Sequence, residues 1–203
     1  HLRVDQIMIE DMLTFEDVGI YSVAIRLAES WYFLPGILVA TLLPYFVSLR
    51  ESSKDLYIKN MVILFSYMFW LGVLIGVLTL LIGEQVIISL FSEQYADSYG
   101  VLSINIWAGI FVAQGTVASI WQVGENLQIY RLYIQLLAVF LNISLNVVLI
   151  DYIGINGAAL ATLATLFFST WIFGLFFKEL RGVTILMIKS INPKFLIINL
   201  KKL

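Results

Sequence analysis

The sequence has no cysteine, and among its 203 residues it has a single histidine, His1. Without cysteine the chain forms no disulfide and offers no thiolate as a nucleophile or metal ligand. With one histidine, metal sites built on imidazole and catalysis by a Ser-His-Asp triad have almost no residues to use. These absences direct attention away from metal and covalent chemistry.

Charged residues are also scarce. They make up 13% of the chain, whereas hydrophobic residues make up 61%, and the mean hydropathy is +0.93. A soluble domain is usually about half apolar and about a quarter charged. The composition therefore predicts an all-α integral membrane protein.

Five hydrophobic stretches are long enough to cross a bilayer. We predict spans over residues 18–49, 61–83, 101–123, 131–150 and 157–177. Residues 2–13 are shorter than the roughly 20 residues that a span needs, so we interpret them as the end of a truncated first span with more chain upstream. Residues 1–177 are then one six-helix transmembrane lobe, and residues 178–203 are a basic cytoplasmic juxtamembrane tail.

Basic residues gather in alternate polar segments. Ten of the twelve Lys and Arg residues lie in the segment 50–60, at Arg131 directly after the segment 124–130, or in the tail. The other segments, residues 10–17, 84–100 and 151–156, hold acidic residues and no Lys or Arg. The positive-inside rule makes the basic side and the C-terminus cytoplasmic.

Two pairs of charges lie within the spans. Arg26 and Glu29 are one helical turn apart in the stretch 18–49, and Arg3 and Asp5 lie in the first stretch. Charges inside a membrane are costly and usually contact a partner, a substrate or water. A binding role for Arg26 and Glu29 is favoured, with mutual neutralisation as the simpler alternative.

Uncharged polar residues form a stripe in the fifth predicted span. Gln128, Gln135, Asn142 and Asn146 follow spacings of seven, seven and four, which places them on one helical face. Gln114 is a comparable residue in the fourth span. These side chains either line a polar cavity or hold helices together, and the spacing fits both roles.

Proline and glycine mark points where the spans bend or pack closely. Pro35, Gly36 and Pro44 predict a kink or hinge in the stretch 18–49. Gly72 and Gly76, four residues apart, predict a face on which another helix approaches closely.

Several segments resemble one family of membrane transporters. They are GIYSVAIRLAESWYFLP at residues 19–35, the later Pro44, LFSEQYADSYGVL at residues 90–102 and NISLNVVLIDYIGINGAALATL at residues 142–163. With DQIMI at residues 5–9, they resemble the second half of Wzx-type flippases, which export O-antigen and other polysaccharides. Those flippases belong to the superfamily of multidrug and polysaccharide exporters.

The resemblance implies the C-terminal lobe of a two-lobe transporter in the bacterial cytoplasmic membrane, working by alternating access. Its substrate would be an undecaprenyl-pyrophosphate-linked oligosaccharide, and its partners the bilayer, a missing N-terminal six-helix lobe and polysaccharide polymerase or assembly proteins. It implies no enzymatic activity, no nucleic acid and no cofactor beyond coupling to H⁺ or Na⁺. The expected substrate-binding residues are Arg26, Glu29, Gln114, Gln135, Asn142, Asn146, Arg3 and Asp5.

Three alternatives remain at this stage. The chain is a cation-coupled drug antiporter of the same superfamily, a membrane-embedded glycan polymerase or ligase, or a fragment that does not transport by itself. The longest segment on the acidic side, residues 84–100, has no basic residue to hold a diphosphate, which argues against the polymerase or ligase.

Overall fold

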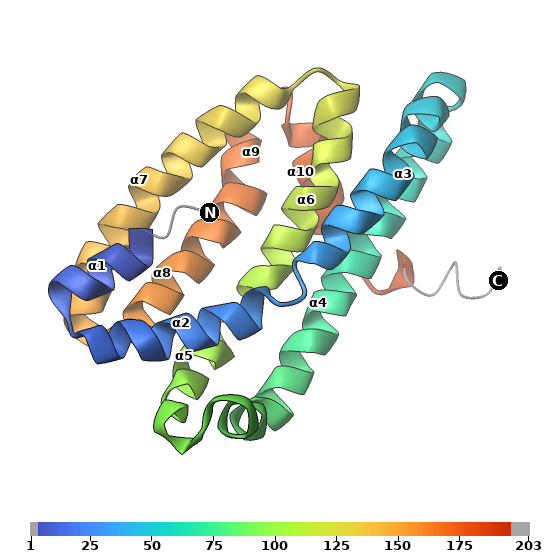
Figure 1. The fold of residues 1–203 in the computed structure, drawn as a ribbon. Coiled ribbons are helices and arrows are strands. Elements are labelled where there is room, and N and C mark those ends of the chain that lie inside the picture. The colour runs from blue at the N-terminus through green and yellow to red at the C-terminus, as the bar shows by residue number, and fades with distance from the viewer. Residues whose placement is uncertain (1–3, 196–203) are drawn as a thin grey trace.

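A bundle of helices accounts for nearly all of the fold (Figure 1). The computed structural model describes residues 4–195 of the chain. The structure is 88% helical, with no strand among these residues. The predicted all-α fold is confirmed, and five helical segments are long and apolar enough to cross a membrane.

The helices follow one another with short connections. They are α1 (Val4–Met12), α2 (Phe15–Glu29), α3 (Phe33–Ser52), α4 (Lys54–Phe91), a 3₁₀ turn η1 (Glu93–Tyr95), α5 (Ser98–Asn105), α6 (Ala108–Gly124), α7 (Gln128–Ile153), α8 (Ile155–Phe167), a π-helical turn η2 (Phe168–Ile172), α9 (Phe173–Phe176) and α10 (Arg181–Lys189).

The membrane-length segments coincide with the five complete spans predicted from the sequence. They cover Phe15–Ser52, Lys54–Phe91, Ser98–Gly124, Gln128–Ile153 and Ile155–Phe176. All except the last extend beyond the predicted bounds at both ends. Hydropathy therefore locates the apolar middle of each segment and underestimates its helical length.

The polar segments predicted as loops are largely helical, which corrects the sequence analysis. Only Ser53 separates α3 from α4, and α4 continues to Phe91, well into the predicted loop 84–100. Residues 84–91 contain no proline or glycine, and α4 runs through them without a break. In residues 50–60 the chain breaks at Ser53 alone, where the backbone is extended and the hydroxyl caps the start of α4. The polarity of 84–91 marks where a helix leaves an apolar environment, not where the helix ends.

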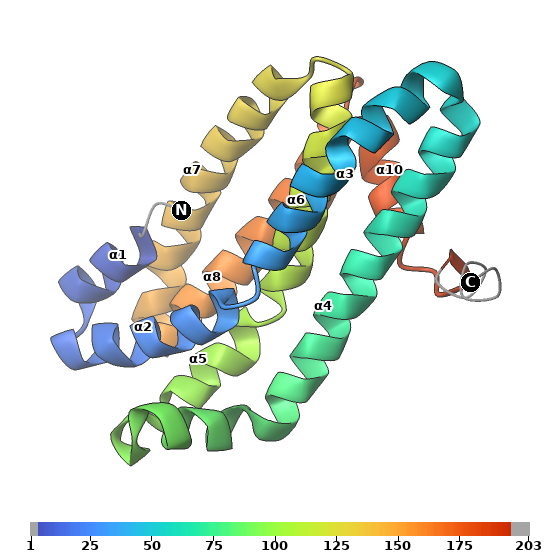
Figure 2. The same cartoon turned by 45° about the vertical axis from the view of Figure 1, so that its right-hand side comes forward.

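The stretch 18–49 changes direction before its first proline. Helix α2 ends at Glu29 and α3 begins at Phe33, and the two run in different directions in both views (Figures 1 and 2). Pro35 is the third residue of α3, where its missing N–H would have no acceptor within the helix. Pro44 lies inside α3, which continues through it. The interruption thus precedes Pro35 and Gly36, and their role as a hinge stays a prediction.

Tryptophan packing fixes this interruption. Trp31, between α2 and α3, is buried, and a β-carbon at Gly109 of α6 would collide with its ring. The absent side chain at Gly109 leaves the space that the indole fills. The direction of α3 relative to α2 therefore depends on a contact with α6.

The two ends of the bundle differ in charge. The α3–α4 turn and the α6–α7 loop lie at one end, and the α1–α2, α4–α5 and α7–α8 connections lie at the other (Figure 1). The first end carries Arg50, Lys54 and Arg131 together with Glu51, Asp55 and Glu125, and we name it the basic end because it holds these basic residues. The second end carries acidic residues and is named the acidic end: Glu10, Asp11, Glu16, Asp17, Glu93, Asp97 and Asp151.

Helix α4 meets the α5–α6 region through the predicted glycine pair. A β-carbon at Gly72 would lie 2.7 Å from Cγ1 of Ile110, and one at Gly76 would lie 2.9 Å from the Trp107 ring. Both glycines are buried. The predicted close approach at Gly72 and Gly76 is confirmed.

The beginning of the predicted tail folds against the bundle. Helix α10 follows α9 and packs against α4, η2 and α6, with Leu180, Val183 and Met187 buried. Of the six basic residues of the tail, Lys201 and Lys202 lie outside the described residues. Residues 181–189 therefore belong structurally with the membrane-length helices.

The α7–α8 turn generates a prediction about stability. A β-carbon at Gly157 would collide with the backbone carbonyl of Leu149, and backbone cannot move aside as a side chain can. We expect Gly157→Ala to destabilise the protein by about 3 kcal/mol. The matched control is Gly36→Ala, because Gly36 is a helical glycine with no atom within 4 Å of its β-carbon position. Thermal unfolding in detergent measures both, and equal melting temperatures would contradict the packing.

Candidate functional site

A buried tyrosine joins three helices near the acidic end. Tyr21 of α2 is fully buried, and its hydroxyl donates a hydrogen bond to Oδ2 of Asp5 on α1. The same hydroxyl lies beside the hydroxyl of Thr162 on α8. We name Asp5, Tyr21 and Thr162 the Tyr21 cluster. A second bond ties α1 to α2, since Nε2 of Gln6 donates to Oγ of Ser22 at 3.1 Å.

The carboxylate of Asp5 is the chemically notable group in the Tyr21 cluster. Asp5 is half-buried, and it forms no ion pair with any other residue between 4 and 195. A carboxylate in an apolar bundle is stable when it is hydrogen-bonded and when a proton or cation offsets its charge. Carboxylate and hydroxyl oxygens are also the ligands that hard cations prefer. The cluster can therefore hold a proton or a small cation.

Two asparagines of the predicted stripe lie on the helix that packs against α1 and α8. Helix α7 contacts mainly α8 and α1, and Asn146 is fully buried on it. Its Nδ2 donates to Oδ1 of Asn142 at 3.0 Å. Its own Oδ1 is buried and accepts no hydrogen bond from the described residues. An acceptor left over in this way is available to a bound ion, water or ligand.

Gln135 and Gln114 have opposite environments. Gln135, two turns before Asn142, is exposed. Gln114 of α6 is fully buried, and its Oε1 accepts a hydrogen bond of 2.6 Å from Nε1 of Trp171. Its Nε2 donates to Oγ of Ser190 at 3.0 Å. Gln114 was an expected substrate-binding residue. Its carboxamide instead bonds α6 to η2 and to the end of α10.

The charge pair on α2 is at the surface of the described protein. Arg26 and Glu29 are both exposed, and Arg26 makes no hydrogen bond or ion pair with another described residue. Glu29 lies close enough to Tyr21 and Tyr32 to act on both hydroxyls electrostatically. No ion pair joins Arg26 to Glu29 among the described residues, and the binding role and mutual neutralisation both stay predictions. Arg3 lies outside the described residues.

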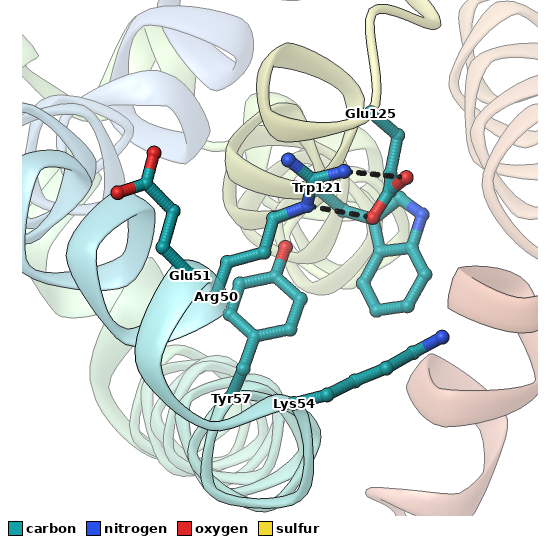
Figure 3. Close-up of a pocket in the computed structure, with 6 residues that line it drawn as sticks. All are labelled: Arg50, Glu51, Lys54, Tyr57, Trp121 and Glu125. Atoms are coloured by element: carbon teal, nitrogen blue, oxygen red, sulfur yellow. Dashed lines mark hydrogen bonds and ion pairs between the residues drawn. The ribbon is translucent and has the colours of Figure 1, made fainter.

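A second site, at the basic end, was not found from the sequence. Nε and Nη2 of Arg50 donate to the two carboxylate oxygens of Glu125, each at 2.9 Å. This bidentate ion pair joins the end of α3 to the residue after α6 (Figure 3). Beside it lies a pocket of about 210 Å³, which we name the Arg50 pocket and which is lined by Arg50, Glu51, Lys54, Tyr57, Trp121 and Glu125.

No local signal links Arg50 to Glu125, because 75 residues separate them. The sequence analysis used Arg50 and Lys54, in the predicted loop 50–60, only to orient the chain in the membrane. The buried aromatic residue Tyr57, within that loop, was the available clue, since an aromatic ring in a solvated loop is unusual.

Comparisons of the chain with models of protein families, with curated proteins and with solved structures find no match.

The two glutamines give a prediction that separates structural from binding roles. Gln114→Leu keeps the side-chain volume but removes the acceptor of the buried Trp171 N–H, so we expect a loss of about 2 kcal/mol in stability. Gln135→Leu, at an exposed position, should change stability by less than about 0.5 kcal/mol. Thermal unfolding of both variants in the same detergent is the measurement. Equal stabilities would mean that Gln114 does not hold the bundle together.

Proposed function

We propose that the chain forms the C-terminal lobe of a two-lobe transporter that moves undecaprenyl-pyrophosphate-linked oligosaccharide across a bacterial cytoplasmic membrane. The observation that carries the transport proposal is Asp5, a carboxylate held by buried Tyr21 among membrane-length helices. Ionisable groups in such a position are typical of ion-coupled transporters. The substrate class follows from the resemblance of the sequence to Wzx-type flippases.

The proposed orientation places the basic end in the cytoplasm. Arg50, Lys54 and Arg131 gather at that end, as the positive-inside rule requires of a cytoplasmic side. Substrate then moves from the basic end toward the acidic end. The lipid tail stays in the bilayer, while the diphosphate and the glycan pass through a cavity completed by the second lobe.

Arg26 is the proposed contact for the diphosphate. It is exposed, and no other described residue uses its guanidinium. A guanidinium matches the oxygen geometry of phosphate and keeps its charge at all physiological pH values. Exposed Gln135, half-buried Asn142 and the unused Oδ1 of Asn146 offer hydrogen bonds to sugar hydroxyls or water.

Asp5 is the proposed coupling group for H⁺ or Na⁺. Its bond to Tyr21 ties α1 to α2, and Tyr21 also neighbours Thr162 of α8. Binding or release of a cation at Asp5 changes the charge that these three helices share. The resulting rotation of α2 would act on the interruption between α2 and α3, where Trp31 is buried.

A cation-coupled drug antiporter is the second candidate, because the Tyr21 cluster would couple ions for that transporter equally well. Arg26 favours the flippase, since an exposed cation on α2 attracts a diphosphate and repels a cationic drug.

The flippase proposal predicts the effects of three substitutions in the complete gene product. Arg26→Ala should lower export of lipid-linked glycan about tenfold through the loss of a charge-assisted contact, and Arg26→Lys should keep part of the activity. Asp5→Asn should abolish ion coupling. Accumulation of lipid-linked repeat units on the cytoplasmic leaflet measures all three.

The control is Asp11→Asn, which removes an exposed carboxylate near the end of the same helix. Each variant must be present in the membrane at the normal amount. Normal export by both Arg26 variants would refute the diphosphate contact, and normal export by Asp5→Asn would refute the coupling role.

A further inference from the structure

The Arg50 pocket contains a hydrogen-bond donor that nothing in the described protein accepts. Tyr57 is 2% exposed, and its hydroxyl is buried without a partner. The ring of Trp121 lies 5.4 Å from that of Tyr57 between centroids and forms an apolar wall, with its Nε1 on the side away from Tyr57 (Figure 3). Both residues line the pocket. Leaving a buried donor unsatisfied is unfavourable, so an acceptor that binds to the Tyr57 hydroxyl would stabilise the protein.

The charged residues that line the pocket are two of each sign. Arg50 and Glu125 neutralise each other through the bonds from Nε and Nη2, which leaves Lys54 and Glu51. The ammonium group of Lys54 extends on the Trp121 side (Figure 3). The carboxylate of Glu51 points away from the two aromatic rings (Figure 3). A ligand with several acceptor oxygens and negative charge matches this set of donors.

The start of a long helix adds to the positive potential. Helix α4 has 38 residues and begins at Lys54, so the first N–H groups of α4 lie beside the pocket. Helix N-termini stabilise anions through these groups and the helix dipole. Asp55, the acidic residue of this first turn, is not part of the pocket lining.

The surroundings of the pocket favour a lipid over a free anion. The pocket is lined from the ends of α3, α4 and α6. Each of these helices is, or is part of, a segment long enough to cross a membrane, and the pocket lies at their basic end. Val47, Leu56 and Val123, within a turn of the lining residues, are exposed apolar side chains on these same helices. Acyl chains can cover such side chains while the headgroup enters the pocket. A volume of about 210 Å³ accommodates a phosphate and its glycerol, and is too small for an oligosaccharide.

We propose that the Arg50 pocket binds the phosphate headgroup of an anionic phospholipid from the leaflet at the basic end. The phosphate oxygens accept a hydrogen bond from the Tyr57 hydroxyl and face the ammonium group of Lys54. The site requires only that the helices lie in a bilayer. It is independent of the transport proposal, because neither Arg26 nor Asp5 contributes to it.

Native mass spectrometry of the purified full chain, with equal amounts of phosphatidylglycerol and phosphatidylcholine, tests the proposal. We expect one phosphatidylglycerol to remain bound in preference to phosphatidylcholine. Tyr57→Phe, which removes only the hydroxyl, and Lys54→Ala should each lower this retention about tenfold. Lys54→Arg should restore most of it. Melting temperatures of the variants show that they remain folded.

Lys59→Ala is the matched control, because Lys59 is exposed on the same helix and outside the pocket. It should bind phosphatidylglycerol as the unaltered protein does. Equal retention of the two lipids, or an equal loss in Lys59→Ala and Lys54→Ala, would overturn the proposal. Displacement of the lipid by an equal concentration of inorganic phosphate would instead assign the pocket to free phosphate and refute the lipid as its ligand.

Discussion

Polar side chains in helices as apolar as these must find partners within the protein, because a hydrocarbon environment supplies none. Gln114 meets this constraint completely: it bonds to Trp171 and Ser190 and so joins α6, η2 and α10. Tyr21 meets it by bonding to Asp5, which fixes α1 against α2. Helices α1 and α10 are therefore held to the neighbouring helices by a few polar contacts as well as by packing. Removing one of these partners leaves the other buried without a hydrogen bond.

The same constraint identifies polar groups that lack a partner within the described protein. The charge of Asp5, the Oδ1 of Asn146 and the hydroxyl of Tyr57 have no full complement among the described residues. Buried polar groups without a partner mark places for an ion, a water molecule or a ligand. Asp5 and Oδ1 of Asn146 are acceptors and fit a cation, whereas the hydroxyl of Tyr57 is a donor and fits an anion. Other buried groups without a partner, such as Nδ2 of Asn105 and the hydroxyls of Ser66 and Thr165, do not follow this division.

The sequence predicts the parts of this fold that depend on local composition. Hydropathy locates all five complete spans, and the spacing of Gly72 and Gly76 predicts the close contact with Ile110 and Trp107. It does not predict where helices end, because polar residues such as those at 84–91 are good helix formers. The bend lies before Pro35, where Trp31 inserts against Gly109. That contact and the Arg50–Glu125 ion pair join residues far apart in the chain, which neither periodicity nor propensity records. The candidate site was predictable only in part for the same reason. The residue types identify Asp5 and Asn146 as candidate binding residues, but they do not show that Gln114 is already hydrogen-bonded to Trp171 and Ser190.

The interrupted segment α2–α3 connects the two candidate sites. Helix α2 carries Tyr21 near the acidic end, and α3 ends at the basic end with Arg50 close to its last residue. Between them, Trp31 is buried against α6, so α2 and α3 cannot rotate relative to each other without changing that contact. A change of charge at Asp5 acts on α2, and the Arg50–Glu125 pair fastens the far end of α3 to the end of α6. Any motion that begins at the Tyr21 cluster must therefore either be absorbed at residues 30–32 or be transmitted to the Arg50 pocket. The burial of Trp31 favours transmission, because a packed indole permits discrete repacking and little continuous bending.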